Sequence, residues 1–120
     1  MAYERAYRSE APTREAVAAS RGPLVLEFGT GWCGHCIAAQ PHIEAVLGAH
    51  PDVPLHKIED GPGRVLGRAF RVKLWPTLVF LRDGVEVARV VRPQDAAPLR
   101  EALDALRALP SPQSAGELRR

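Results

Sequence analysis

Apolar runs alternate with stretches of helical periodicity along the first half of the chain. The run "PLVLEFG" (23–29) is nearly continuous and is bounded by glycine and proline, which predicts a strand buried on both faces. Apolar residues then recur at helical spacing over about 34–49, with Pro41 placed where it should kink the helix. The run "VPLHKIE" (53–59) predicts a second buried strand, and a short helix over about 62–70 should follow it.

The second half of the chain has the pattern of a hairpin followed by a helix. Asp-Gly at 83–84 separates two β-rich runs, 76–82 and 85–91, and this dipeptide strongly favours a two-residue turn between antiparallel strands. Asp95 can cap the helix that comes next. The buried stripe of that helix should consist of leucines at helical spacing, namely Leu99, Leu103, Leu106 and Leu109.

The two ends of the chain carry weaker patterns. "YERAY" near the start can form a short edge strand, and residues 12–20 favour a helix. The last stretch, "PSPQSAGELRR", is small, polar and proline-containing, which predicts a flexible tail over 110–120. No repeat or linker divides the rest, so we expect one domain over 1–109.

These elements predict an α/β fold. Their order, β-α-β-α-β-β-α, favours an open, mixed β-sheet flanked by helices on both faces. Right-handed crossovers would place the segment after the first strand at the carboxyl end of a central strand, where ligand chemistry collects in such sheets.

Composition and charge exclude several classes of function. The chain has 120 residues, of which 46% are hydrophobic and 25% charged, as expected for one globular domain. Its net charge is +2 and its basic residues are scattered among acidic ones, so we expect neither nucleic acid nor membrane as a partner. No apolar stretch has the length of a signal peptide or membrane span, which predicts a cytoplasmic protein, or a periplasmic one if a signal peptide has been removed.

Both cysteines lie in "FGTGWCGHCIAAQP" (28–41), two residues apart. A disulfide between them would close too small a loop to add much stability, so the pair is a poor structural staple. A zinc site would need two more ligands, and the remaining histidines lack the required spacing: His42, His50 and His56. The pair therefore favours redox chemistry and predicts no metal.

The helix start after the first strand gives the two sulfurs different roles. Cys33 stands where the positive helix end and its free N–H groups favour thiolate over thiol, and His35 can add a second favourable charge or donor. Cys36, one turn further along, should be more buried and less acidic. We expect an exposed Cys33 to attack a partner's disulfide and Cys36 to resolve the mixed disulfide that forms.

These residues resemble the thioredoxin superfamily. The resemblance lies in "FGTGWCGHC", in "WPT" (75–77) and in "RDG", and it extends over about 3–108. The Cys-Gly-His-Cys core, with Gly34 and His35 between the sulfurs, is similar to the catalytic domains of protein disulfide isomerase. The resemblance implies a thioredoxin fold and a thiol-disulfide oxidoreductase without a bound cofactor. Its partners would be protein disulfide or dithiol substrates and an upstream electron donor or acceptor, and we expect a monomer.

The resemblance also assigns residues to a substrate groove. It implies a cis peptide bond before Pro76, with the backbone of Trp75 pairing to the substrate like an added strand; the alternative is a proline that merely starts a strand. Thr77 completes that motif, and Trp32 would shield the rim of the active site. Arg92 replaces part of a glycine-containing segment that helps to form the groove in the family.

Glu27 interrupts an otherwise apolar strand, so its carboxylate should be poorly solvated. By resemblance, Lys57 matches a lysine that pairs with this carboxylate. A buried acid near Cys36 can take up its proton and return it. The alternative is an edge carboxylate in solvent. If the relay exists, Glu27→Gln should fold at least as stably as the native chain and turn over more slowly.

Other positions depart from the family pattern. Gly29 stands where an aromatic residue is common, and Ile37 stands where a basic residue usually follows the second cysteine. Two hypotheses of function therefore remain: an oxidoreductase that cycles between dithiol and disulfide, and a non-catalytic thioredoxin-like binding module, such as a metal or protein carrier.

Overall fold

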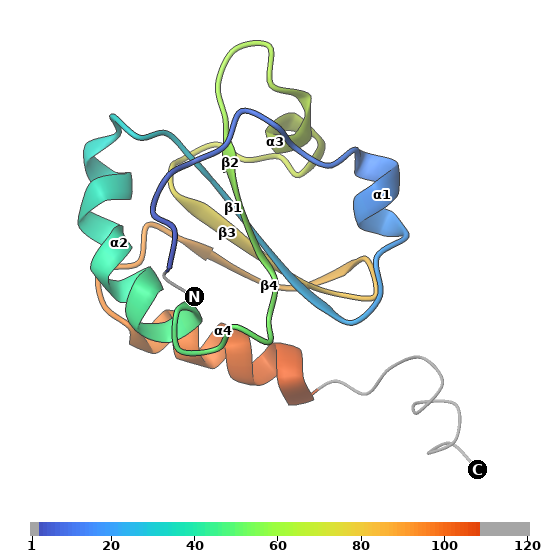
Figure 1. Ribbon diagram of the computed structural model, residues 1–120, viewed down its shortest axis with the longest axis vertical. Helices are drawn as coiled ribbons and strands as arrows, with labels where there is room; N and C mark the ends of the chain where they lie inside the picture. The colour runs from blue at the N-terminus through green and yellow to red at the C-terminus, as the bar shows by residue number, and fades with distance from the viewer. Residues whose placement is uncertain (1–2, 109–120) are drawn as a thin grey trace.

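The computed structural model describes residues 3–108, which form a four-stranded sheet flanked by helices (Figure 1). The elements follow one another as α1 (Arg14–Ala18), β1 (Pro23–Gly29), α2 (Gly34–Leu47), β2 (Leu55–Glu59), α3 (Val65–Ala69), β3 (Thr77–Arg82), β4 (Val85–Val91) and α4 (Ala97–Ala108). The strand order is β2-β1-β3-β4. The β1–β2 pair is parallel, whereas β1–β3 and β3–β4 are antiparallel, which confirms the predicted mixed sheet.

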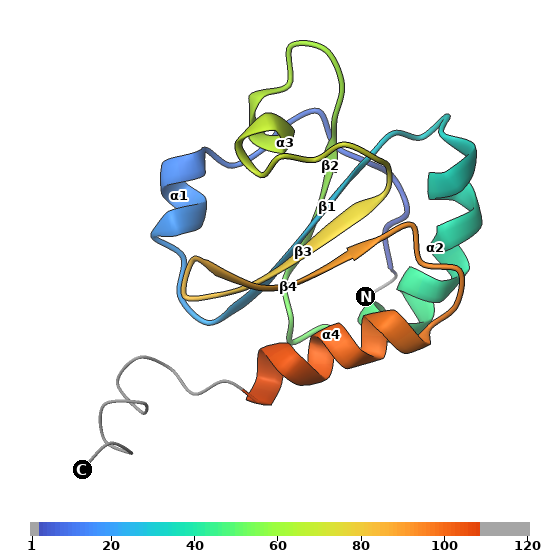
Figure 2. The same cartoon turned by 180° about the vertical axis from the view of Figure 1, so that it is seen from behind.

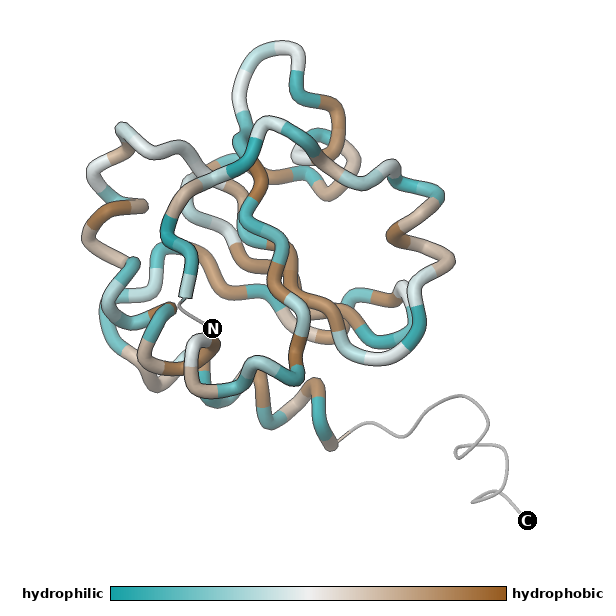
Figure 3. The backbone as a smooth tube through the Cα atoms, viewed as in Figure 1, coloured by the Kyte–Doolittle hydropathy of each residue, from teal (hydrophilic) through white to brown (hydrophobic). Residues whose placement is uncertain are grey.

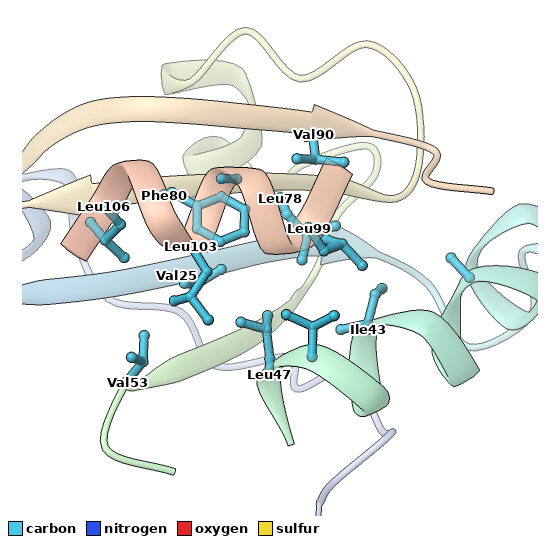
Figure 4. Packing of buried hydrophobic residues seen from close by; sticks show 13 residues of the cluster. Val25, Ile43, Leu47, Val53, Leu78, Phe80, Val90, Leu99, Leu103 and Leu106 are labelled. Atoms are coloured by element: carbon cyan, nitrogen blue, oxygen red, sulfur yellow. The ribbon is translucent and has the colours of Figure 1, made fainter. Parts of the chain in front are cut away.

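Helices cover both faces of the sheet (Figures 1 and 2). Side chains alternate across a strand, so Val25 of β1 packs against α2 and α4 while its neighbours Leu24 and Leu26 pack against α1 and α3. Hydrophobic segments gather on the central strands in Figure 3. Figure 4 shows how the leucines of α4 meet Val25 and Phe80 between the layers.

Two structural features predicted from local sequence signals are present in the fold. Asp83 and Gly84 both have positive φ, 52° and 79°, as a tight hairpin turn between β3 and β4 requires. A Cβ atom at residue 84 would lie 2.2 Å from the backbone oxygen of Ala18, so only glycine fits there. At α4, the carboxylate of Asp95 accepts a hydrogen bond from the Ala97 N–H at 2.8 Å, which confirms the predicted cap.

The helices are shorter than predicted. The helix predicted over 34–49 ends at Leu47, and those predicted over 12–20 and 62–70 cover 14–18 and 65–69. The helix α2 continues through Pro41, and the kink there stays a prediction. Leu109 and the tail over 110–120 lie outside the described residues. No helix in the described part of the chain is long and apolar enough to cross a membrane.

The edge strand predicted at "YERAY" does not form there. The contact with the sheet comes one residue later, where Arg8 bridges β2 by donating its N–H to Lys57 O at 2.9 Å and accepting from Glu59 N at 2.8 Å. The preceding segment runs between α2 and β2 (Figures 1 and 2). Its residues serve other contacts, since Arg5 pairs with Glu44 of α2 at 2.7 Å and Tyr7 points into the interior. This placement brings Tyr7 of the segment into contact with Glu27 of β1.

Candidate active site

The two cysteines stand at the junction of β1 and α2. Cys33 is the N-cap of α2, and its Sγ accepts a hydrogen bond from the backbone N–H of Cys36 at 3.3 Å. The sulfur therefore lies at the positive end of the helix, as predicted. Both cysteines are free. This arrangement gives the helix terminus a direct contact with the Cys33 sulfur.

The two cysteines differ less in solvent exposure than the sequence predicted. Cys36 is 1% exposed and Cys33 is 8% exposed, so the order is as predicted, but the expectation of an exposed Cys33 is wrong. The cap explains the difference, because it turns the Cys33 sulfur inward toward the first turn of α2 rather than outward into solvent. His35 lies exposed in that turn, as does Gly34, and the influence of His35 on Cys33 stays a prediction.

Burial also makes Cys36 a weak acid. Desolvation raises the pKa of the Cys36 thiol to about 11, and its hydrogen bond with Cys33 adds to the rise. Hydrogen bonds that the Thr30 backbone and the Tyr7 hydroxyl make to the thiolate form lower the pKa again, by less. At neutral pH the Cys36 thiol is therefore protonated and needs a base before it can attack.

Glu27 and Lys57 form a buried ion pair. They lie directly opposite each other in the parallel β1–β2 register, on the face that α2 covers. Lys57 Nζ lies 2.8 Å from Glu27 Oε1, and the two side chains are 5% and 0% exposed. The predicted poor solvation and pairing are confirmed, and the alternative of an edge carboxylate in solvent is wrong.

Three further polar side chains complete this cluster, and sequence reasoning missed them. Gln40 of α2 donates to Glu27 Oε2 at 3.0 Å and accepts from Lys57 Nζ at 2.7 Å. The Tyr7 hydroxyl donates to the same Glu27 oxygen, and the Tyr3 hydroxyl accepts from Lys57 Nζ at 3.2 Å. Gln40 could have been found as the polar residue one turn after Cys36 on a buried helix face. No local pattern pointed to the tyrosines.

The cluster shifts the acidity of its members. Burial lowers the pKa of Lys57, although the Glu27 charge and its hydrogen bond oppose that shift. Burial and the Glu27 charge raise the pKa of Tyr3 and of Tyr7. Both phenols therefore remain protonated, and Glu27 is surrounded by hydrogen-bond donors.

One predicted groove residue, Trp75, contacts Trp32, the residue before Cys33. The bond before Pro76 is cis, so the alternative of a proline that merely starts a strand is wrong. Trp75 donates its indole N–H to Asp60 Oδ2 at 2.9 Å, and its ring stands edge-on to Trp32 with 5.8 Å between centroids. Thr77 begins β3 and is buried, with its hydroxyl donating to Leu74 O at 2.6 Å.

Arg92 lies at the same loop and has a specific partner. Its Nε donates to Trp75 O at 2.8 Å, and its backbone N–H donates to Pro76 O at 2.9 Å. The two residues predicted to bind substrate are therefore bonded to each other, and the guanidinium occupies a backbone acceptor of the groove.

Comparison with known proteins identifies the family of this fold and site. A family model described as Thioredoxin matches residues 6–105. The chain belongs to the thioredoxin family. Among solved structures, the chain is similar to reduced thioredoxin 2 from Pseudomonas aeruginosa PAO1, with 58% identity, a TM-score of 0.76, and coverage of 84% of this chain and 94% of that one.

Curated thioredoxins from distant organisms are also similar. Thioredoxin H2-1 of rice is 32% identical over 70% of this chain and 60% of its own length, and Thioredoxin C-3 of Corynebacterium nephridii is 33% identical over 68% of this chain and 57% of its own length. Protein disulfide-isomerase A2 of Pongo abelii is 43% identical over 51% of this chain and 12% of its own length. The chain thus spans less than two thirds of these curated relatives.

The ion pair changes the expectation for the stability of Glu27→Gln. The sequence predicted that the variant folds at least as stably, because a poorly solvated acid is removed. The structure shows that removing it leaves the Lys57 ammonium buried without its counter-charge.

We expect Glu27→Gln to lower the free energy of unfolding at pH 7 by up to about 3–5 kcal/mol, because one charge of a buried pair is left unpaired. Burial holds the pKa of Lys57 below its usual value of 10.5 while the Glu27 charge opposes that shift, so the pKa is lower still in the variant. The folded variant therefore loses the Lys57 proton before its unfolded chain does, and its stability rises with pH up to 10.5. The deficit of the variant should therefore shrink with rising pH. Urea denaturation at pH 7 and pH 9, each against the native chain, measures it.

The double variant Glu27→Gln/Lys57→Met is the matched control, since it removes the stranded charge and should recover most of the lost stability. A single variant as stable as the native chain at pH 7 contradicts this role of the pair.

Proposed function

We propose that this protein is a thiol-disulfide oxidoreductase that reduces or exchanges disulfides in protein substrates. The observation that carries the proposal is the Cys33 sulfur at the N-terminus of α2, where it accepts a hydrogen bond from the Cys36 N–H. In the reducing direction, the Cys33 thiolate attacks a substrate disulfide, one substrate sulfur leaves, and a mixed disulfide forms. Cys36 then attacks Cys33 Sγ, the second substrate sulfur leaves, and the Cys33–Cys36 disulfide remains.

The second step needs a proton acceptor. Burial raises the pKa of Cys36 to about 11, so its thiolate is scarce at neutral pH. The Glu27–Lys57 pair is connected to Cys36 through Gln40, whose Nε2 donates to Glu27 Oε2 at 3.0 Å and to Cys36 O at 3.1 Å. We propose that the carboxylate accepts the Cys36 proton while Lys57 holds the carboxylate in place. The electrons that restore the dithiol come from a partner protein or small thiol, and the protein acts as a monomer.

Substrate binding falls to the cis-proline loop. We propose that an extended substrate segment pairs with the backbone of Trp75 and packs against Trp32, which is 76% exposed. Arg92 donates to the Trp75 carbonyl, so an incoming segment has to displace the guanidinium to use that acceptor. The compartment, cytoplasm or periplasm, stays a prediction from the sequence.

One observation favours a second candidate, a thioredoxin-like module that binds without turnover. Cys33 is only 8% exposed, which restricts the approach of a folded partner. Insulin reduction by dithiothreitol separates the two functions, because only an oxidoreductase accelerates it, and only with Cys33 present.

The order of attack gives a direct test of the main proposal. Cys36→Ser should accumulate stable mixed disulfides with protein substrates, since attack by Cys33 proceeds but resolution lacks its thiol. Cys33→Ser should trap nothing. Non-reducing gels followed by mass spectrometry measure the trapped species and name the substrates.

Equal trapping by both variants contradicts the assigned roles. Trapping by neither variant, together with no acceleration of insulin reduction by the native chain, favours the binding module instead.

The redox potential should lie between those of thioredoxin and protein disulfide isomerase, which are about −270 and −180 mV. His35 stands in the position between the sulfurs where thioredoxin has proline. A hydrogen-bond donor there stabilises the reduced dithiol, which makes the pair more oxidising. Equilibration against glutathione buffers, with the oxidised fraction followed by mass, measures the potential. A value at or below that of thioredoxin contradicts the role of His35.

Arg92→Ala should free the Trp75 carbonyl. The KM for an extended peptide disulfide should fall about two- to tenfold, the worth of one net hydrogen bond, while kcat stays unchanged. Arg89→Ala is the matched control, because Arg89 pairs with Glu86 on β4 and leaves the loop untouched. A higher KM in Arg92→Ala would show instead that the guanidinium itself holds the substrate.

A further inference from the structure

Tyr7 lies where the reacting sulfur and the buried carboxylate can both reach it. A Cβ atom at Gly29 would lie 2.7 Å from Cys36 Sγ and 2.8 Å from the Tyr7 hydroxyl oxygen, so these two groups converge over the bare glycine. The same Cβ would lie 2.8 Å from Cζ of the Tyr7 ring. The aromatic residue common at this position in the family is thus absent, and a phenol from the N-terminal segment uses the space.

Several contacts fix the phenol in that place. Its hydroxyl donates to Glu27 Oε2, and Gln40 Nε2 donates to the hydroxyl oxygen at 3.3 Å while also bonding to the same carboxylate. Lys57 Nζ lies 4.7 Å from the centroid of the ring. Tyr7 is therefore held between Cys36 on one side and Glu27 on the other.

We propose that the Tyr7 hydroxyl relays the proton between Cys36 and Glu27 during resolution of the mixed disulfide. As Cys36 Sγ attacks Cys33 Sγ, its proton passes to the Tyr7 oxygen and the Tyr7 proton passes to Glu27 Oε2. The Cys33–substrate bond breaks and the substrate sulfur leaves with its electron pair. Tyr7 is neutral before and after, so the net transfer is from the Cys36 thiol to the Glu27 carboxylate.

The hydrogen bonds of the cluster suit a relay that can reverse. In the resting state the hydroxyl donates to Glu27. With the proton on Glu27 and Cys36 as a thiolate, the carboxyl donates to the phenol and the phenol donates to the sulfur, which is the hydrogen bond that lowers the pKa of Cys36. Burial and the Glu27 charge raise the pKa of Tyr7, so the phenol has no stable phenolate state in which the proton would be lost.

The charged and titratable neighbours are few and give a matched control. Glu27, Lys57 and Cys36 face Tyr7, and Cys33 is the hydrogen-bond neighbour of Cys36. Tyr3 is a similar half-buried phenol in the same segment, and its hydroxyl bonds to Lys57. Tyr3→Phe therefore removes a hydroxyl from the same cluster without removing the proposed relay.

A competing route runs through solvent. An open cavity of about 160 Å³ lies beside Cys36 and Tyr7 and is also lined by Arg5, Thr30, Ile37 and Gln40. Water in this cavity could accept the Cys36 proton directly, in which case the phenol would be dispensable.

The inference rests on the proposed function, and the test uses two readouts to keep them apart. Stopped-flow single turnovers with a peptide disulfide separate attack by Cys33 from resolution by Cys36. Tyr7→Phe should slow resolution about ten- to a hundredfold at pH 7 and leave attack unchanged. Tyr3→Phe, which loses only the hydrogen bond with Lys57, should slow resolution much less than Tyr7→Phe does. Titration of the Cys36 ¹³Cβ resonance in the reduced protein, which needs no turnover, should show a higher Cys36 pKa in Tyr7→Phe only.

Each outcome decides the matter. Resolution by Tyr7→Phe at the native rate overturns the relay in favour of the solvent route, and equal slowing by both phenylalanine variants assigns the phenols a structural role. An unshifted Cys36 resonance in Tyr7→Phe overturns the contact itself. If the native chain does not turn over at all, the proposed function fails, and the relay fails with it even where the resonance shifts.

Discussion

The ion pair between Glu27 and Lys57 is the constraint on which the active site depends. Two charges inside a sheet are costly unless they meet, and the parallel register of β1 and β2 makes them meet with 2.8 Å between Nζ and Oε1. Slipping this register by one residue would turn one of the two charges into the apolar layer under α1 and α3. The pair therefore fixes how β1 aligns with the edge strand β2, and with it the point at which β1 leads into the segment of Cys33.

Three neighbouring side chains hydrogen-bond to this ion pair. Gln40, on α2, hydrogen-bonds to both Glu27 and Lys57 and so holds the cysteine-bearing helix against the ion pair. Tyr7 hydrogen-bonds to Glu27 and Tyr3 to Lys57, both from the N-terminal segment that runs between α2 and β2. A buried carboxylate that only stabilised the fold would be replaceable by apolar packing. We propose that it also accepts the proton of Cys36, whose thiol pKa burial raises to about 11.

The sequence predicted those features that local patterns encode. The strands, the Asp-Gly hairpin, the Asp95 cap and the placement of Cys33 at a helix start all follow from residues close together in the chain. The burial of Cys33 was missed because the direction of a capping side chain depends on tertiary packing. The positions of Tyr3 and Tyr7 were missed for a related reason: their partners lie on β1, β2 and α2, far away in the chain, and nothing in "YERAY" states which side of the sheet edge those rings take. The ion pair itself came from family resemblance rather than from periodicity, since a buried lysine in a strand has no local signature.

The proposed role of the buried carboxylate is to move a proton as well as to stabilise the sheet. The double variant Glu27→Gln/Lys57→Met separates these roles, because it removes the carboxylate without leaving a charge stranded. Stopped-flow measurement of mixed-disulfide resolution by this variant between pH 6 and 8 is the most direct test. Our account predicts a stably folded protein in which Cys33 attacks at the native rate and Cys36 resolves the mixed disulfide up to about a hundredfold more slowly. Resolution at the native rate across that range would contradict it and leave Glu27 a purely structural residue.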